Sequence, residues 1–153
     1  MTLSNNGVDL IKDFEGFRAK AYLDSVGVPT IGFGSTMWND GRKVKLGETI
    51  TIEDAEKLLH WEVVNKTTII NILLKGIDIS QNQFNALASF TYNVGIGALT
   101  NSTLLKKVKA CPNDFTIRNE FMKWNKGHRN GKLITLPGLT KRRAEEADLY
   151  FTI

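Results

Sequence analysis

The chain has 153 residues, and 42% of them are hydrophobic, so it can bury a core within one domain. This composition excludes a disordered chain, and no apolar run approaches the ~20 residues that span a bilayer. Twenty basic residues against 16 acidic ones give a net charge of +4, and residues 77–153 hold 11 basic and six acidic groups. The second half is therefore expected to attract polyanions, either anionic envelope polymers or nucleic acid.

The single cysteine, Cys111, cannot form an internal disulfide, so the fold must be stable without one. We expect Cys111 to be a small buried hydrophobic residue. The first 30 residues lack a charged segment followed by a long apolar run. No export signal or membrane anchor is therefore expected.

A short helix is predicted at the start of the chain. Val8, Ile11 and Phe14 keep helical spacing, which gives this helix an apolar stripe. Gly16 then offers a place for the helix to stop. Glu15 is therefore expected on the last helical turn.

A hairpin is predicted over residues 22–34, where turn residues separate two extended pieces. This places Asp24 on the hairpin turn and Thr30 on the returning strand. Gly32 and Gly34 leave one side of that strand bare. We expect this bare side to give a polysaccharide room to approach.

Two carboxylates so placed suit glycoside hydrolysis. That reaction needs one carboxylic acid to protonate the leaving oxygen and one carboxylate to activate water or to attack the sugar. Glu15 and Asp24 are the candidates for this pair. The same residues also fit a charged helix end and an ordinary turn aspartate, and spacing alone favours that simpler explanation.

A third strand is predicted after the hairpin. The sequence Asn39-Asp40-Gly41 is a turn signal within the polar residues 38–48. Val44 and Leu46 alternate with lysines after it, as in a strand with one buried face. The three strands would complete a small antiparallel sheet.

A long helix is predicted over residues 51–75. Thr51 and Asp54 form an approximate capping box at its start, and Gly76 is a natural terminator. At ~1.5 Å per residue this helix exceeds roughly 30 Å. A helix of that length can join two lobes.

The second half is predicted to be mainly helical. Ser80 and Gln83 form a capping box for a helix with an apolar face, and Tyr92 and Asn93 near its end are candidates for sugar contact. Further helices are predicted from Ser102 to Lys109, over residues 114–125 with Phe115, Phe121 and Trp124 as core anchors, and from Pro137 onward.

Two basic stretches stand out in this half. Residues 126–135 read as a strongly basic loop, in which His128 is a candidate for substrate contact. In the last helix, Lys141, Arg142 and Arg143 cannot all point the same way. Two of these three are expected on a solvated face, paired with acidic residues of the same helix.

Three segments together resemble one known family. The first runs from Glu15 through Asp24 and Thr30 into I-G-F-G; the others are QNQFNALASFTYNVGIGAL over residues 81–99 and GLTKRRAEEADL over residues 138–149. Their residues and their order resemble those of phage-type lysozymes, the endolysins with which tailed bacteriophages open their hosts. The resemblance spans nearly the whole chain.

This resemblance implies a single α+β catalytic domain of the lysozyme type. A small lobe of about residues 13–50 would hold the three-stranded sheet, and a joining helix of about 51–75 would lead to a mainly helical lobe of about 80–153, on which the N-terminal helix packs. The cleft would lie between the lobes. By the resemblance Glu15 is the general acid.

By the same resemblance Asp24 is the second catalytic carboxylate, and Thr30 supplies the hydroxyl that helps place the attacking water. A hydroxyl beside a carboxylate makes sense mainly if water occupies the gap, so we predict inversion rather than a covalent glycosyl-enzyme. We also predict that Arg142 or Arg143 reaches the Glu15 carboxylate in the free enzyme.

The implied reaction is hydrolysis of the β-1,4 bond between N-acetylmuramic acid and N-acetylglucosamine in peptidoglycan, without a metal or cofactor. The protein would wait in the host cytoplasm until a separate pore-forming phage protein releases it to the periplasm or cell wall. We expect a monomer that is attracted to anionic envelope polymers. It is not expected to bind nucleic acid or to carry a membrane anchor.

Two other functions fit parts of the sequence. His60, His128 and Cys111 are a conceivable zinc set for a cell-wall amidase, but His60 has no second ligand one helical turn away. The basic second half also fits a non-enzymatic module that binds nucleic acid, although no reading helix or stacking surface is recognisable. Lysis of permeabilised bacteria would distinguish the hydrolase from this module.

Overall fold

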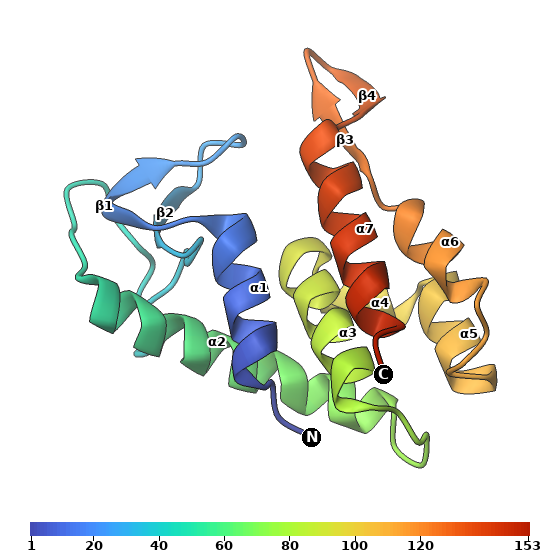
Figure 1. The fold of residues 1–153 in the computed structure, drawn as a ribbon. Helices are drawn as coiled ribbons and strands as arrows, with labels where there is room; N and C mark the ends of the chain where they lie inside the picture. Colours follow the sequence, from blue (N-terminus) through green and yellow to red (C-terminus); the bar gives the residue numbers. More distant parts are fainter. The chain divides into compact units, whose positions relative to one another are not determined.

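The computed structural model describes residues 1–153, which form seven helices and two short antiparallel hairpins (Figure 1). In chain order the elements are α1 Asn5–Glu15, β1 Arg18–Leu23, β2 Pro29–Gly32, α2 Ile52–Leu73, α3 Gln81–Val94, α4 Ile96–Thr100, α5 Thr103–Ala110, α6 Ile117–Met122, β3 Lys126–Arg129, β4 Lys132–Thr135 and α7 Pro137–Tyr150. Contacts along the chain divide it into a small unit, residues 8–65, and a helical unit, residues 1–7 and 66–153.

In the small unit, α1 ends at Glu15 as predicted. Gly16 adopts a φ of +66° and its N–H donates to the carbonyl of Lys12 at 2.9 Å, which closes the helix. The Lys12 side chain also pairs with Glu56 on α2 at 2.5 Å. This ion pair helps to hold α1 against α2, so the position of Glu15 depends on both helices.

The strands β1 and β2 pair as predicted, but the expected third strand is wrong. The segment that follows makes single bridges only, Lys20 with Thr49 and Met37 with Lys43. A turn at Gly47, with a φ of +93°, interrupts the segment before the backbone can form a continuous ladder. The sheet of the small unit is therefore two-stranded.

The long helix α2 is confirmed at 22 residues. The Thr51 hydroxyl accepts a hydrogen bond from the N–H of Asp54 at 3.2 Å, so the predicted N-terminal cap is present. The helix continues without a break across the division between the two units. None of the helices combines the length and the apolar character that crossing a bilayer requires.

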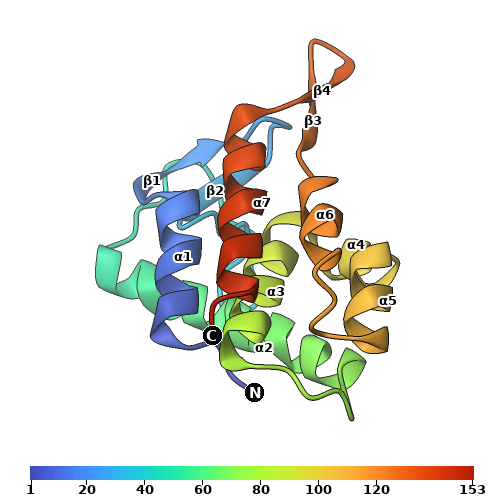
Figure 2. The same ribbon diagram turned by 45° about the vertical axis from the view of Figure 1, so that its right-hand side comes forward.

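In the helical unit, α3 is the central helix and lies beside α7 in both views (Figures 1 and 2). Its predicted capping box is confirmed: Ser80 accepts from the N–H of Gln83, and the Gln83 side chain accepts from the N–H of Ser80. The buried core packs around it and comprises Ile70, Leu74, Phe84, Ala86, Leu87, Ala88, Phe90, Leu99, Leu104, Leu105, Val108, Ile117, Phe121, Ala147 and Tyr150.

Three predictions for the helical unit are wrong. Residues 126–135 are a hairpin, β3–β4, and not a loop, because Asn130 and Gly131 both take positive φ and form a tight two-residue turn. Phe115 is 68% exposed and contacts Phe151 at the surface, with ring centroids 5.1 Å apart, instead of anchoring the core. Cys111 is exposed, since it follows the last turn of α5.

Candidate active site

The Glu15 carboxylate lies against the backbone of Gly34. A Cβ atom added to Gly34 would sit 3.1 Å from Glu15 Oε2, and Gly34 has a φ of +89°. The backbone there turns back on itself, with Ile31 and Ser35 exchanging both of their backbone hydrogen bonds. Glycine at position 34 is therefore needed both for the turn and for the space that the carboxylate fills.

Gly32 has a different role from the one expected. A Cβ atom added to Gly32 would lie 3.1 Å from the Cβ of Ala55, so its bare side faces α2. The expectation that both glycines make room for a polysaccharide is thus wrong for Gly32, which allows β2 to pack closely on the helix. Gly34 alone leaves its open side at the Glu15 carboxylate.

Asp24 is fixed by the turn that joins β1 to β2. Its Oδ1 accepts hydrogen bonds from the N–H groups of Val26 at 2.9 Å and Val28 at 2.8 Å, and its own N–H donates to the Val28 carbonyl at 3.0 Å. Carboxylates commonly organise turns in this way. Because Oδ1 is occupied by the turn, Oδ2 is the oxygen that remains for chemistry.

Thr30 is held by the same turn. Thr30 is only 4% exposed, and its hydroxyl donates a hydrogen bond to the Val28 carbonyl at 2.9 Å. One carbonyl oxygen therefore accepts hydrogen bonds from both Asp24 and Thr30. Since the hydroxyl proton is used, the hydroxyl oxygen of Thr30 can only accept a hydrogen bond from any further partner.

All three predicted catalytic residues belong to the small unit. Glu15 comes from the end of α1, Asp24 from the β1–β2 turn and Thr30 from β2. The set can supply an acid, a carboxylate oxygen and an acceptor hydroxyl. That is the combination an acid-assisted attack by water requires.

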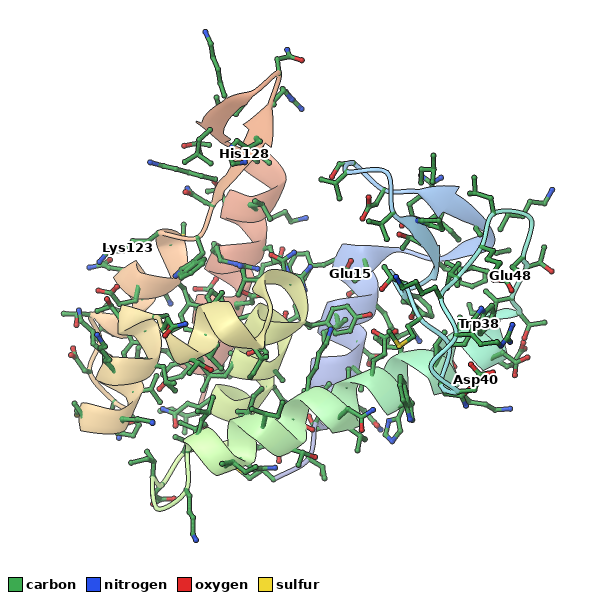
Figure 3. The ribbon with its side chains drawn as sticks, turned by 180° about the vertical axis from the view of Figure 1, so that it is seen from behind. Glu15, Trp38, Asp40, Glu48, Lys123 and His128 are labelled. Atoms are coloured by element: carbon green, nitrogen blue, oxygen red, sulfur yellow. The ribbon has the colours of Figure 1, made fainter.

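A separate pocket of about 430 Å³ in the small unit contains none of these three residues. Trp38 lines it, and the indole N–H donates to Glu48 Oε2 at 3.0 Å (Figure 3). A hydrogen bond from the N–H of Lys45, with this indole bond, holds the pKa of the Glu48 carboxyl below its usual value. Figure 3 places Trp38 and Glu48 together and away from Glu15.

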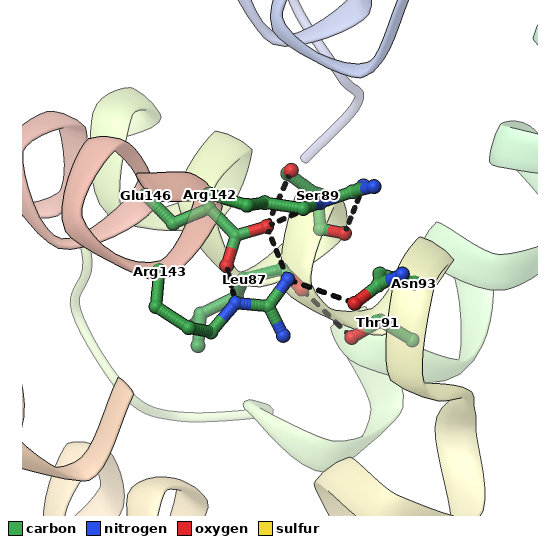
Figure 4. A network of polar contacts seen from close by, with 7 residues as sticks. All are labelled: Leu87, Ser89, Thr91, Asn93, Arg142, Arg143 and Glu146. Atoms are coloured by element: carbon green, nitrogen blue, oxygen red, sulfur yellow. Dashed lines mark hydrogen bonds and ion pairs between the residues drawn. The ribbon is translucent and has the colours of Figure 1, made fainter. Parts of the chain in front are cut away.

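Arg142 and Arg143 lie in a buried network at α7, not on a solvated face (Figure 4). Arg142 Nε lies 3.1 Å from Glu146 Oε1 and Arg143 Nε lies 2.8 Å from Glu146 Oε2. Ser89 donates to the same carboxylate at 2.7 Å. The prediction that two of the three basic residues are solvated is wrong, since only Lys141 is exposed.

The network couples three α7 residues, Arg142, Arg143 and Glu146, to α3. Removal from water raises the pKa of the Glu146 carboxyl above its usual value, and the two guanidinium groups oppose that rise. Arg143 is fully buried and its guanidinium lies 5.0 Å from the centroid of the Phe90 ring. Arg143 Nη2 also donates to Asn93 Oδ1 at 3.0 Å, so Asn93 is oriented by this network.

The other predicted substrate contacts are scattered over the helical unit. Tyr92 is half-buried on α3, with the Lys66 ammonium 4.1 Å from its ring centroid. Asn93 is exposed beside it, and His128 is exposed on β3. Their contacts with sugar stay predictions. No three His, Cys, Asp or Glu side chains in either unit are grouped to hold a metal ion.

The groups that contact the candidate catalytic residues could not be predicted from the sequence. The Val28 carbonyl is a backbone group and leaves no signal in the residue type. Gly34 is visible as part of I-G-F-G, but its proximity to Glu15 depends on a turn that brings distant backbone atoms together. The pairing of the basic triplet with Glu146 was predicted and is confirmed, but its burial was not predicted.

Comparison with known proteins gives matches over most of the chain. A family model described as phage lysozyme matches residues 12–146. The endolysin of Acyrthosiphon pisum secondary endosymbiont phage 1 is 40% identical over 151 residues, which is 98% of each chain.

Two solved structures share the fold. The endolysin from Escherichia coli O157:H7 phage FAHEc1 has a TM-score of 0.91 and 42% identity, and the match covers 99% of this chain and 94% of that one. The muramidase domain of SpmX from Asticaccaulis excentricus has a TM-score of 0.85 and 34% identity, with 99% of both chains covered.

Proposed function

The chain belongs to the phage lysozyme family, and from this membership we propose that Glu15, Asp24 and Thr30 carry out its hydrolysis of peptidoglycan. The observation that carries the proposal is the Val28 carbonyl, which binds both Asp24 and Thr30 while Glu15 lies over the Gly34 backbone in the same unit. The bond cleaved is the β-1,4 link between N-acetylmuramic acid and N-acetylglucosamine.

Glu15 acts as the general acid. Its carboxyl group gives a proton to the glycosidic oxygen as the bond from that oxygen to the anomeric carbon breaks, so the departing sugar leaves as a neutral alcohol. The close approach of the Gly34 backbone limits the positions that this carboxyl group can take. A fixed proton donor is useful because the acid must meet one particular oxygen.

Asp24 and Thr30 hold the attacking water between them. One water proton bonds to Asp24 Oδ2, which the turn leaves available, and the other bonds to Thr30 Oγ1, which can accept because its own proton goes to Val28. A lone pair of the water oxygen then faces the anomeric carbon. As the new bond forms, the water proton passes to the Asp24 carboxylate.

Arg142 or Arg143 contacts the Glu15 carboxylate in the free enzyme. Both arginines are oriented by their shared partner Glu146, and a planar guanidinium group suits a carboxylate. Substrate would have to displace this contact. Tyr92, Asn93 and His128 are proposed to contact the glycan strand.

The protein acts as a monomer on peptidoglycan, without metal or cofactor. It is made in the host cytoplasm, and a separate pore-forming phage protein releases it to the periplasm or cell wall. Its basic residues draw it to anionic envelope polymers.

The assigned roles of the two carboxylates are tested by replacing each with its amide. We expect Glu15→Gln and Asp24→Asn to fold normally and to lower the rate of turbidity loss of purified peptidoglycan by about 10²–10⁴-fold, the usual contribution of an acid or base. Circular dichroism and the thermal midpoint check the fold. Wild-type rates for Glu15→Gln would refute its role.

The water mechanism predicts inversion at the anomeric carbon. Thr30→Val keeps the side-chain shape but removes the acceptor, so we expect turnover to fall strongly while the thermal midpoint changes little. NMR of the first-formed reducing end, recorded before mutarotation, identifies the anomer. An α product supports inversion, whereas a β product from the β-linked substrate would show retention and overturn this mechanism.

A further inference from the structure

The hairpin β3–β4 carries charges that the protein itself does not neutralise. Lys126, Arg129 and Lys132 are all exposed, and none of them forms an ion pair or a side-chain hydrogen bond. The helical unit has 13 Lys and Arg against six Asp and Glu. Four of these six acidic groups, Glu120, Glu145, Glu146 and Asp148, pair with basic residues outside the hairpin.

The register of the hairpin adds a repulsive contact at its tip. Arg129 and Lys132 are direct cross-strand partners, so their side chains emerge from the same face of the ribbon. Like charges directly opposite one another destabilise a two-stranded ribbon. The hairpin tolerates this pair without an acidic neighbour, which is the arrangement expected where an external anion provides the compensation.

The hairpin is also held in a fixed shape. The Asn130-Gly131 turn has positive φ at both residues, 52° and 75°, as tight two-residue hairpin turns require. At the base, Gly127 lies so close to Leu136 that an added Cβ would sit 2.5 Å from Leu136 Cδ1. The base of the hairpin therefore packs against Leu136, and the charged tip extends beyond the first turn of α7 (Figure 2).

The distribution of charge over the two faces indicates the kind of partner. Lys126 projects from one face, and Arg129 and Lys132 project from the other. A flat bilayer can meet only one face of such a ribbon at a time. A flexible linear chain with a phosphate in every repeat can wrap around the ribbon and meet both faces.

We propose that the β3–β4 hairpin binds the phosphodiester backbone of a wall polymer of the teichoic-acid type. The proposal rests on the proposed function, because it gives the peptidoglycan hydrolase a second hold on the wall through a polymer attached to its substrate. Each phosphate displaces solvent ions from a Lys or Arg, so binding weakens steeply with salt.

The test uses the protein with Glu15→Gln, so that binding is measured without hydrolysis. Fluorescence titration with purified poly(glycerol phosphate), and sedimentation with walls that retain or have lost that polymer, compare two charge variants. R129Q/K132Q neutralises the tip. K106Q/K109Q removes the same charge from two exposed lysines of α5 in the same unit.

We expect R129Q/K132Q to bind poly(glycerol phosphate) about tenfold more weakly at 50 mM salt and to show a shallower salt dependence. K106Q/K109Q should bind like the parent. Equal losses in both variants would mean that net charge alone attracts the polymer, and no loss in either would mean that the hairpin does not bind it. Both outcomes overturn the proposal.

Two further measurements distinguish this proposal from binding to other polyanions and from the proposed function. Anionic phosphatidylglycerol vesicles and duplex DNA are titrated in the same way, and hairpin-dependent binding as strong as that to the polymer would overturn the assignment. The charge variants with intact Glu15 should hydrolyse polymer-free peptidoglycan at the parent rate. If the parent itself fails on that substrate, the proposed function fails while the binding result stands.

Discussion

Gly34 leaves space that the Glu15 carboxylate fills, although it carries no chemistry of its own. The residue combines a backbone conformation that favours glycine with a face that lies against the proposed acid. These two demands can be separated by experiment, because Gly41 has the same φ of +89° and has nothing within 4 Å of an added Cβ.

We predict that Gly34→Ala and Gly41→Ala each cost about 1 kcal/mol of unfolding free energy, since alanine is strained at this φ. Only Gly34→Ala should also displace the Glu15 carboxylate and lower peptidoglycan hydrolysis, by about 100-fold for a shift near 1 Å. Urea unfolding and the hydrolysis rate measure the two effects. Equal activity in the two variants would show that Glu15 tolerates the added methyl group.

The candidate catalytic residues have local signals in the sequence, and their roles stay predictions. Glu15 is followed at once by the glycine that ends its helix, and Asp24 lies among residues that favour turns. The support for these side chains was not predictable. It comes from the Val28 carbonyl and the Gly34 turn, and neither contact is fixed by the identity of the catalytic residue.

At the scale of elements, the helices with good caps were predicted best. Ser80, Ser102 and Pro137 mark helix starts through hydrogen bonds or a fixed φ that involve only neighbouring residues. The third strand failed because a strand exists only where a partner backbone lies alongside it. Of the two apolar residues that alternate with lysines, Val44 is buried but Leu46 is 56% exposed, so the segment has no continuous buried face.

The β3–β4 hairpin shows the opposite error. Its Asn130-Gly131 turn is the strongest short hairpin signal, but the polar and basic residues around it suggested a loop. The basic residues favoured a loop, because strands are usually recognised by apolar residues that alternate with polar ones. In α7, likewise, burial of Arg142 and Arg143 could not be read from spacing, since it depends on Glu146 and the facing residue Ser89.

For the whole molecule, the carboxyl groups determine how stability changes with pH. Hydrogen bonds to the ionised form lower four pKa values, those of Asp40, Glu48, Asp114 and Glu120. A lowered folded pKa contributes stability that is present above the ordinary value and is lost as pH falls through the folded value. Glu146 has the opposite sign, because burial raises its pKa and favours the folded state at low pH.

Glu120 should account for most of the stability that is lost at acid pH. Its side chain is 5% exposed and pairs with Lys107 at 3.0 Å and Lys123 at 2.9 Å, whereas Asp40 is exposed and its ion pair is screened by solvent. We predict that Glu120→Gln lowers the thermal midpoint at pH 7, by roughly 3 °C for each kcal/mol lost. As pH falls below the ordinary value of 4.5 for glutamate, the parent should lose this stabilisation and approach the variant. Thermal unfolding between pH 7 and pH 3 measures both curves.

The Asp40→Asn variant is the control, and its thermal midpoint should follow that of the parent throughout this pH range. Parallel curves for the parent and Glu120→Gln would show that the ion pairs of Glu120 do not set the acid sensitivity of the fold.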